Sequence, residues 1–211
     1  MKRQLESQRS ALPTSQNTAV VNDSSNADIP DQLVDAIAHG DSMALAKLGD
    51  YTKFQTDYYR TNSIGLQGDE HAAVWGKSFR GIASAFDRLS DEATKGNANA
   101  RQAIMQATRM NTLRGFAVDS LGKLAGSGDE GALEMLLNPA QNGLLLSGTI
   151  AALQPAADAG NQRAIVTLAS ILGDEKKKSL WLIASQGLQK AAASGNMTAI
   201  NVLNSLQPQQ Q

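Results

Sequence analysis

Apolar residues recur at three- and four-residue spacing along most of this chain, and short polar or glycine-containing breaks separate the apolar stretches. Residues 164–172 give the clearest example, and the break after them is Gly173-Asp174. This spacing places apolar side chains on one face of an α-helix. The pattern therefore predicts an all-α fold built from short amphipathic helices.

One short motif recurs along the chain and divides it into units. Each copy has a glycine, then Asn or Asp, then Ala four residues after the glycine, and usually Leu or Ile eight residues after it. The glycines are Gly40, Gly68, Gly96, Gly128, Gly160 and Gly195, so the copies are 28, 28, 32, 32 and 35 residues apart. The copy at Gly68 is the weakest, because Gly76 stands where the others have Leu or Ile. Periods of this length are typical of helical repeat arrays.

The residue types of the motif explain what it does locally. Glycine adopts the left-handed backbone conformation that ends a helix without a clash of a Cβ atom. The Asn or Asp that follows can accept a hydrogen bond from a free amide at the start of the next helix. Each copy is therefore expected to end one helix and begin another, and about 30 residues per unit leave room for two helices and two turns.

Two stretches show the end of one helix, the cap and the start of the next most clearly, namely residues 190–196 (Lys-Ala-Ala-Ala-Ser-Gly-Asn) and 156–161 (Ala-Ala-Asp-Ala-Gly-Asn). They resemble the helical-hairpin repeats of the HEAT-like and the Sel1-like or TPR-like families. The chain lacks the Trp-Tyr pair and second glycine turn of a Sel1 unit, which favours the HEAT-like group. The resemblance covers residues 31–206 and implies an α-solenoid of about six helical hairpins that binds macromolecules and has no catalytic role.

The two ends of the chain differ from this repeat domain. Residues 1–30 are rich in Ser, Gln, Asn and Thr, and their composition predicts a disordered polar tail. The tail is either a terminus without a role or, because it resembles the polar, Ser-rich and acid-poor leaders of type III secretion effectors, an export signal. Residues 207–211 form a second polar tail.

Composition narrows the classes of protein. Hydrophobic residues make up 42% of the chain but aromatic residues only 4%, so Ala, Leu, Ile, Val and Met must supply most of the core. A formal net charge of −1 argues against nucleic-acid binding through an overall positive field. The chain has no cysteine, which excludes disulfides and thiolate sites.

Neither a membrane span nor a Sec signal is expected from the apolar runs. The longest of them are far shorter than the roughly 18 to 20 residues of a membrane helix. Polar residues follow the basic start at residues 1–4, where a Sec signal would have an apolar segment. We expect a cytoplasmic protein or, if the tail is an export signal, one that a type III system secretes into a host cell.

The search for chemistry predicts no catalytic residue, cofactor or metal site. Gly76-Lys77-Ser78 matches the end of a phosphate-binding loop, but His71 stands where the first glycine of that motif should be. The other histidine, His39, is 32 residues from His71, and no further ligand has metal-site spacing to either. We therefore expect no enzymatic activity.

Charge is distributed unevenly along the repeats. Residues 77–123 contain eight basic and four acidic residues, whereas residues 124–175 contain one basic and six acidic residues. This is either an ordinary solvated surface or, as our binding hypothesis, a groove in which Arg101, Arg109 and Arg114 face an acidic protein segment or a phosphate backbone.

Aromatic residues concentrate in residues 42–60. There Leu45, Leu48, Tyr51, Phe54 and Tyr58 share a helical stripe that is expected to pack in the core. Tyr59 lies off that stripe and is predicted to be exposed, as a further candidate partner contact.

The sequence thus predicts a non-enzymatic protein–protein interaction module that binds a protein partner through an extended helical-repeat groove. Two alternatives stay open. One is a bacterial type III effector that acts on a host protein, and the other is a HEAT-like nucleic-acid binder, which the net charge disfavours. The oligomeric state and the partner's identity stay open as well.

Overall fold

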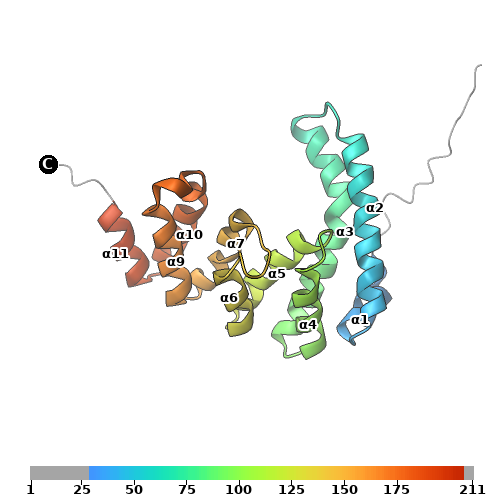
Figure 1. Cartoon of the computed structure of the whole chain (residues 1–211), viewed down its shortest axis with the longest axis horizontal. Helices are drawn as coiled ribbons and strands as arrows, with labels where there is room; N and C mark the ends of the chain where they lie inside the picture. The colour runs from blue at the N-terminus through green and yellow to red at the C-terminus, as the bar shows by residue number, and fades with distance from the viewer. Residues whose placement is uncertain (1–28, 207–211) are drawn as a thin grey trace, which may run out of the picture.

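The structure is a computed structural model that describes residues 29–206, and this part of the chain is helical throughout, with no strand (Figure 1). The all-α prediction is confirmed for these residues. Both predicted tails, apart from Ile29 and Pro30, lie outside the described residues. The helices are α1 (Asp31–Ala38), α2 (Ser42–Asn62), α3 (Gly68–Thr94), α4 (Ala98–Ala107), α5 (Arg114–Gly126), α6 (Glu130–Leu137), α7 (Leu146–Ala152), α8 (Gln154–Asp158), α9 (Gln162–Leu172), the 3-10 helix η2 (Glu175–Leu180), α10 (Trp181–Ala193) and α11 (Met197–Leu206).

Five of the six predicted turns have one shared geometry. Each glycine has a φ between 86° and 99°, and the Asn or Asp after it accepts hydrogen bonds from amides of the next helix through its side chain. The amide of that Asn or Asp donates to the carbonyl five residues earlier, which closes the end of the preceding helix. The glycines of these turns are Gly40, Gly96, Gly128, Gly160 and Gly195.

The sixth copy, at Gly68, does not form this turn, and the prediction of a cap there is wrong. Gly68 is the first residue of α3, its preceding residue Gln67 makes no capping bond, and Asp69 lies inside the first helical turn. Residues 63–67 instead connect two long helices, α2 and α3. This copy also differs at Gly76, which stands where four of the other units have a buried Leu or Ile.

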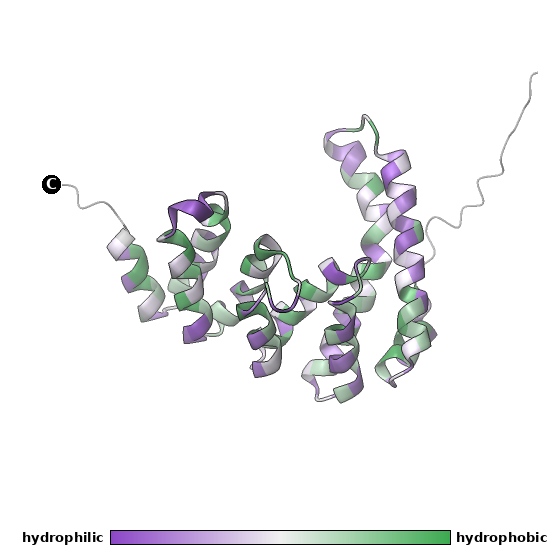
Figure 2. Cartoon of the chain, viewed as in Figure 1, coloured by the Kyte–Doolittle hydropathy of each residue, from purple (hydrophilic) through white to green (hydrophobic). Residues whose placement is uncertain are grey.

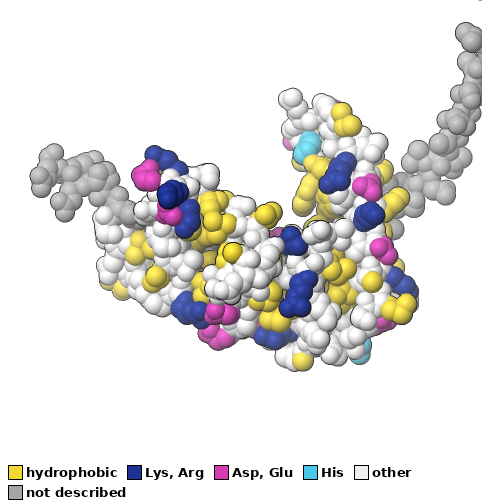
Figure 3. All heavy atoms as spheres, viewed as in Figure 1, with side chains coloured by type: hydrophobic (Ala, Val, Ile, Leu, Met, Phe, Trp, Pro, Cys, Tyr) yellow, Lys and Arg dark blue, Asp and Glu magenta, His cyan; other side chains and the backbone are white. Residues whose placement is uncertain are grey.

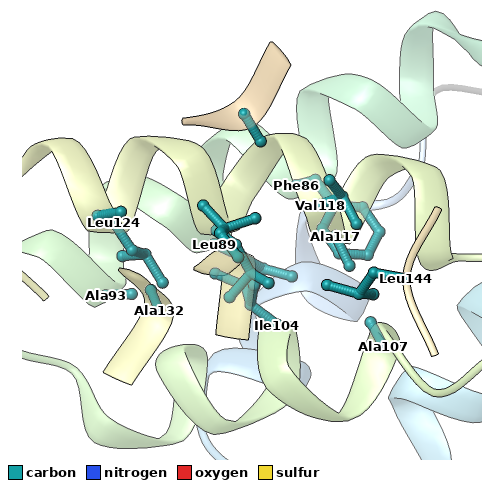
Figure 4. Close-up of a cluster of buried hydrophobic side chains, with 14 of the residues drawn as sticks. Phe86, Leu89, Ala93, Ile104, Ala107, Ala117, Val118, Leu124, Ala132 and Leu144 are labelled. Atoms are coloured by element: carbon teal, nitrogen blue, oxygen red, sulfur yellow. The ribbon is translucent and has the colours of Figure 1, made fainter. Parts of the chain in front are cut away.

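The helices follow one another along the long axis of the molecule (Figure 1), and their contacts divide them into two sets, one of which we call the first row. In the first row α1, α3, α5, the α7–α8 pair and α10 each pack against the next, and α2, α4, α6, α9 and α11 pack against this row from outside. Small residues allow the first row to pack closely. A Cβ atom on Gly122 of α5 would come within 2.6 Å of the Ala152 carbonyl oxygen in α7. Figure 4 shows the resulting core, where α3, α4, α5 and α6 contribute Leu, Ile, Ala and Phe side chains.

The helices of the first row run parallel. Phe79 and Asp87 of α3 contact Phe116 and Lys123 of α5, in the same order along both helices. The contacts of α5 with α7 and of α8 with α10 follow the same order. The amino-terminal ends of these helices therefore lie along one edge of the molecule, which we call the N-terminal edge.

The helices α2 and α3 extend beyond this edge (Figure 1). No residue from 56 to 77 is buried, whereas the rest of both helices contributes to the core. We call residues 56–77 the tip, and residues 42–55 with 78–94 the base.

Two helices end or break next to a proline. α6 ends at Leu137, directly before Asn138-Pro139. The helical stretch around Pro155 is interrupted at Leu153, where α7 gives way to α8 with Pro155 in the first turn of α8.

Candidate protein-interaction surface

Arg101, the first of the three candidate arginines, forms a two-pronged ion pair within the protein. Its Nε and Nη2 atoms both donate to the carboxylate of Asp129, with 2.9 Å between Nη2 and Oδ1. This hydrogen bonding raises the pKa of Arg101 and holds the pKa of Asp129 below its usual range. Because Asp129 also caps α6, Arg101 ties α4 to the turn of the next unit.

Arg114 and Arg109 lie on either side of the connection between α4 and α5. Arg114 donates from Nε to the Thr108 carbonyl oxygen at 3.0 Å and from Nη2 to Asn111 Oδ1 at 2.9 Å, so it stabilises this connection. Arg109 is exposed and has no hydrogen bond or ion pair of its side chain among the described residues. Of the three arginines, only Arg109 is therefore free to meet a partner, and the binding role of the set stays a prediction.

Ion pairs also join other neighbouring units. They connect α3 to α1, α5 to α3, α9 to α6 and α10 to α8. The pairs are Arg88–Asp35, Lys123–Asp87, Arg163–Glu134 and Lys190–Asp158. Part of the uneven charge along the sequence is thus engaged in ion pairs between helices, most of which are exposed.

Tyr59 and Phe54 exchange the positions that the sequence predicts for them. Tyr59 is half-buried, its hydroxyl lies 2.6 Å from Nε2 of His71, and its ring centroid is 5.4 Å from that of Phe79. Phe54, predicted to pack in the core, is 64% exposed. The reason is that Thr52 and Gln55 are the buried residues in this part of α2, and a search for apolar stripes passes over polar residues.

A continuous row of aromatic rings runs from the core of the base to the surface of the tip. Successive ring centroids are 6.1 Å apart from Phe86 to Phe116, 6.0 Å to Phe79 and 5.8 Å to Trp75. Phe86 is 2% exposed and Trp75 is 48% exposed. Sequence reasoning missed Trp75 as a surface residue, although its four-residue spacing from His71 and Phe79 was available as a signal.

Basic side chains lie beside this row on the same flank of the tip. Gly49 of α2 faces the α4–α5 connection, where a Cβ atom would come within 2.7 Å of Met110 Cε. Lys53 and Arg60 follow Gly49 by 4 and 11 residues, so they lie on the same face of α2. Lys53 has no partner among the described residues, and the only ion pair of Arg60 is an exposed contact of 4.0 Å with Asp57.

The N-terminal edge carries further exposed apolar residues. Leu145 precedes α7 and is 72% exposed, and Leu146 and Leu182 are also exposed. Gly148 of α7 lies against Val118 of α5, so Leu145 is level with the first turn of α5. Figure 3 shows a hollow in this edge between the tip and the η2–α10 region, with hydrophobic side chains on both sides, and Figure 2 shows hydrophobic residues continuing along α5 and the segment before α7.

The remaining candidate chemistry has other geometry. Gly76-Lys77-Ser78 lies in the interior of α3, and the Ser78 hydroxyl donates to the Val74 carbonyl oxygen at 2.9 Å, so this segment forms no phosphate-binding loop. His39 lies at the end of α1, with Nδ1 2.7 Å from the Asp35 carbonyl oxygen. Among the described residues, no helix has the length and apolar character to cross a membrane.

Comparison of the chain with protein-family models, with curated proteins and with solved structures gave no match in any of the three cases. The resemblance to HEAT-like and Sel1-like repeats therefore rests on the residues of the turns alone.

Proposed function

We propose that this protein is a non-enzymatic protein-interaction module whose helical hairpins form a short α-solenoid of the HEAT-like type. The partner binds in the hollow of the N-terminal edge. The observation that supports this proposal most directly is the set of large apolar side chains left exposed around the hollow, beside basic side chains without partners.

The argument is one of surface chemistry. Large apolar side chains gathered in one region of a surface mark sites of protein interaction more often than single exposed residues do. Tryptophan and arginine are also enriched in the centres of protein interfaces. Trp75 is exposed on the tip, Leu145 is exposed before α7, and Arg109 belongs to the connection between α4 and α5.

The export alternative depends on residues 1–30, nearly all of which lie outside the described residues. The nucleic-acid alternative would need a basic face, and much of the positive charge of the described chain is engaged in ion pairs with acidic neighbours. Both alternatives stay predictions.

The test starts with cross-linking of the full-length chain in the cells that produce it, followed by reconstitution of the complex from two purified proteins. Leu145→Glu should weaken a reconstituted complex at least about tenfold, because it places a charge in the apolar interface. Met43→Glu is the matched control, since Met43 is equally exposed but begins α2 at the opposite edge. Absence of a stoichiometric protein complex, or equal weakening by both variants, would overturn the proposal.

A further inference from the structure

We infer that the flank of the tip binds an acidic amphipathic helix of a partner protein, which lies against Trp75 directly beyond the first turn of α5. This inference rests on the proposed function and adds to it the place of binding and the kind of segment bound. The flank consists of Tyr59, Arg60, His71 and Trp75 of the tip, together with the adjoining Lys53 of the base and Arg109 of the α4–α5 connection.

The first step concerns what covers α3 along its length. In the base, α5 covers this side of α3 through the Phe79–Phe116 ring contact and through the Ser120 hydroxyl, which lies 3.3 Å from the Phe86 carbonyl oxygen. α5 begins only at Arg114, whereas α3 continues past Phe79 to Gly68. The side of α3 that faces α5 in the base therefore has no neighbouring helix in the tip.

The uncovered face has the shape that a helix needs. Ala72 and Gly76 lie beside Trp75 at helical spacing, and their small side chains allow another helix to approach closely. A Cβ atom on Gly76 would meet only the Arg80 side chain, at 3.5 Å. Residues 68–77 of α3 span about 15 Å, which is the length of two to three helical turns. An apolar side chain of a docked helix would extend the aromatic row that ends at Trp75.

The charge of the flank decides which helix fits. Lys53 and Arg109 have no ion pair among the described residues, and Arg60 has only the 4.0 Å contact with Asp57. Of the two further acidic residues of the tip, Glu70 is turned from Trp75 by more than a quarter of the helix circumference, whereas Asp69 lies seven residues before Gly76 and therefore on the uncovered face. An acidic amphipathic helix would find apolar contact at Trp75 and opposite charge at Lys53, Arg60 and Arg109, which outnumber Asp69 on this flank.

The experiment uses two synthetic probes of about 14 residues that share one pattern of leucines at helical spacing. One carries glutamate at its remaining positions and the other lysine. Trp181→Phe in the full-length chain leaves Trp75 as the only tryptophan, so its fluorescence reports docking. The glutamate probe should shift the Trp75 emission to shorter wavelength with saturation, and the lysine probe should not.

Charge-reversed variants test the site itself. Lys53→Glu with Arg109→Glu should weaken binding of the glutamate probe at least about tenfold, because both contacts become repulsive. Lys47→Glu with Lys77→Glu is the matched control. Both are exposed lysines without partners, on the sides of α2 and α3 that face away from the flank. The control pair should change binding less than about twofold.

Several results would overturn the inference. The two probes could bind equally, or the glutamate probe could fail to saturate at roughly 1 mM. The two charge-reversed pairs could have equal effects on binding. The Trp75 emission could also shift with protein concentration alone, which would make a second copy of the chain the occupant. A reconstituted complex that tolerates both Trp75→Ala and the Lys53–Arg109 reversal would keep the proposed function and remove only this site. Failure to find any protein complex would remove the proposed function itself.

Discussion

The base and the tip of the α2–α3 pair belong to the same two helices but are stabilised differently. In the base, Leu48, Ile82 and Leu89 are fully buried between neighbouring units. In the tip, no residue is buried, and the aromatic side chains Tyr59, His71 and Trp75 contact only one another or Phe79 in their ring pairs. Helical periodicity continues through both regions. The comparison shows that periodicity fixes the helix, whereas neighbouring helices decide which part of its apolar face is covered.

The difference in burial between the base and the tip separates stabilisation of the fold from contact with other molecules. Burial in the base supplies stability, because removal of apolar surface from water is the main favourable contribution to folding. The tip holds Trp75 and Ile64 at the surface, where they contribute little to stability and are available to another molecule. Three pairs of substitutions test this separation.

The largest difference in the free energy of unfolding is expected between the variants Phe86→Ala and Trp75→Ala. Phe86→Ala should lower the free energy of unfolding by about 3 to 5 kcal/mol, because it opens a cavity in a closed part of the core. Trp75→Ala should cost about 1 kcal/mol or less, since about half of the Trp75 side chain is already in water. Urea denaturation followed by circular dichroism measures both. A similar loss for the two variants would mean that the tip belongs to the core.

A smaller difference in the free energy of unfolding is expected between alanine substitutions of the glycines that lie just outside the two ends of α3. Gly96 has a φ of 99° in the α3–α4 turn, and Gly65 has a φ of 79° in the connection before α3; neither has an atom in the way of a Cβ. Gly96→Ala should therefore act through the backbone alone and cost about 1 to 2 kcal/mol. Gly65→Ala should cost less than about 0.5 kcal/mol, because the connection at the tip can rearrange without opening the core.

The same denaturation curves provide a control for this pair. Gly115 lies in α5 at an ordinary helical φ with open space for a Cβ, so Gly115→Ala should be neutral or slightly stabilising. Equal losses for Gly96→Ala and Gly65→Ala would contradict the view that the tip unfolds independently of the base.

The sequence was sufficient to predict five of the six turns because the two residues that form each turn are adjacent in the chain. A glycine for the left-handed position and an Asn or Asp for the cap act locally, and five of six copies formed the same turn. The exception at Gly68 also had a local warning, since Gly76 replaces the anchoring apolar residue. A solenoid arrangement of the units depends on packing between them and stays a proposal.

The candidate site was harder to predict because its properties depend on distant neighbours. Arg101 and Arg114 have the same residue type as Arg109, but partners at Asp129 and Thr108 engage them within the protein. Trp75 has the periodicity of a core residue and is exposed only because α5 begins too late to cover it. Neither the pairing nor the missing cover is visible in the spacing of residues along the chain.

The smallest difference is expected between two carboxylates, Asp129 between neighbouring units and Asp57 in the tip. The Asp129 side chain is 16% exposed and is bonded to Arg101, whereas the Asp57 side chain is 64% exposed and lies 4.0 Å from Arg60. Asp129→Asn keeps a good capping side chain but removes the charge, as Asn97 and Asn161 show in equivalent turns. Asp129→Asn should lower the free energy of unfolding by about 1 kcal/mol, and Asp57→Asn should leave it almost unchanged.

The pH dependence distinguishes this ion pair from the cap. Folding lowers the pKa of Asp129, chiefly through the hydrogen bonds from Arg101. The stabilisation is therefore complete above the ordinary carboxyl pKa of about 4 and is lost as the pH falls through the lowered value. The gap in unfolding free energy between the native chain and Asp129→Asn should accordingly be constant near neutral pH and close on acidification. A gap that persists unchanged in acid would assign the effect to the cap instead of the charge, and with it the difference between the Asp129 ion pair and the ion pair of the tip would disappear.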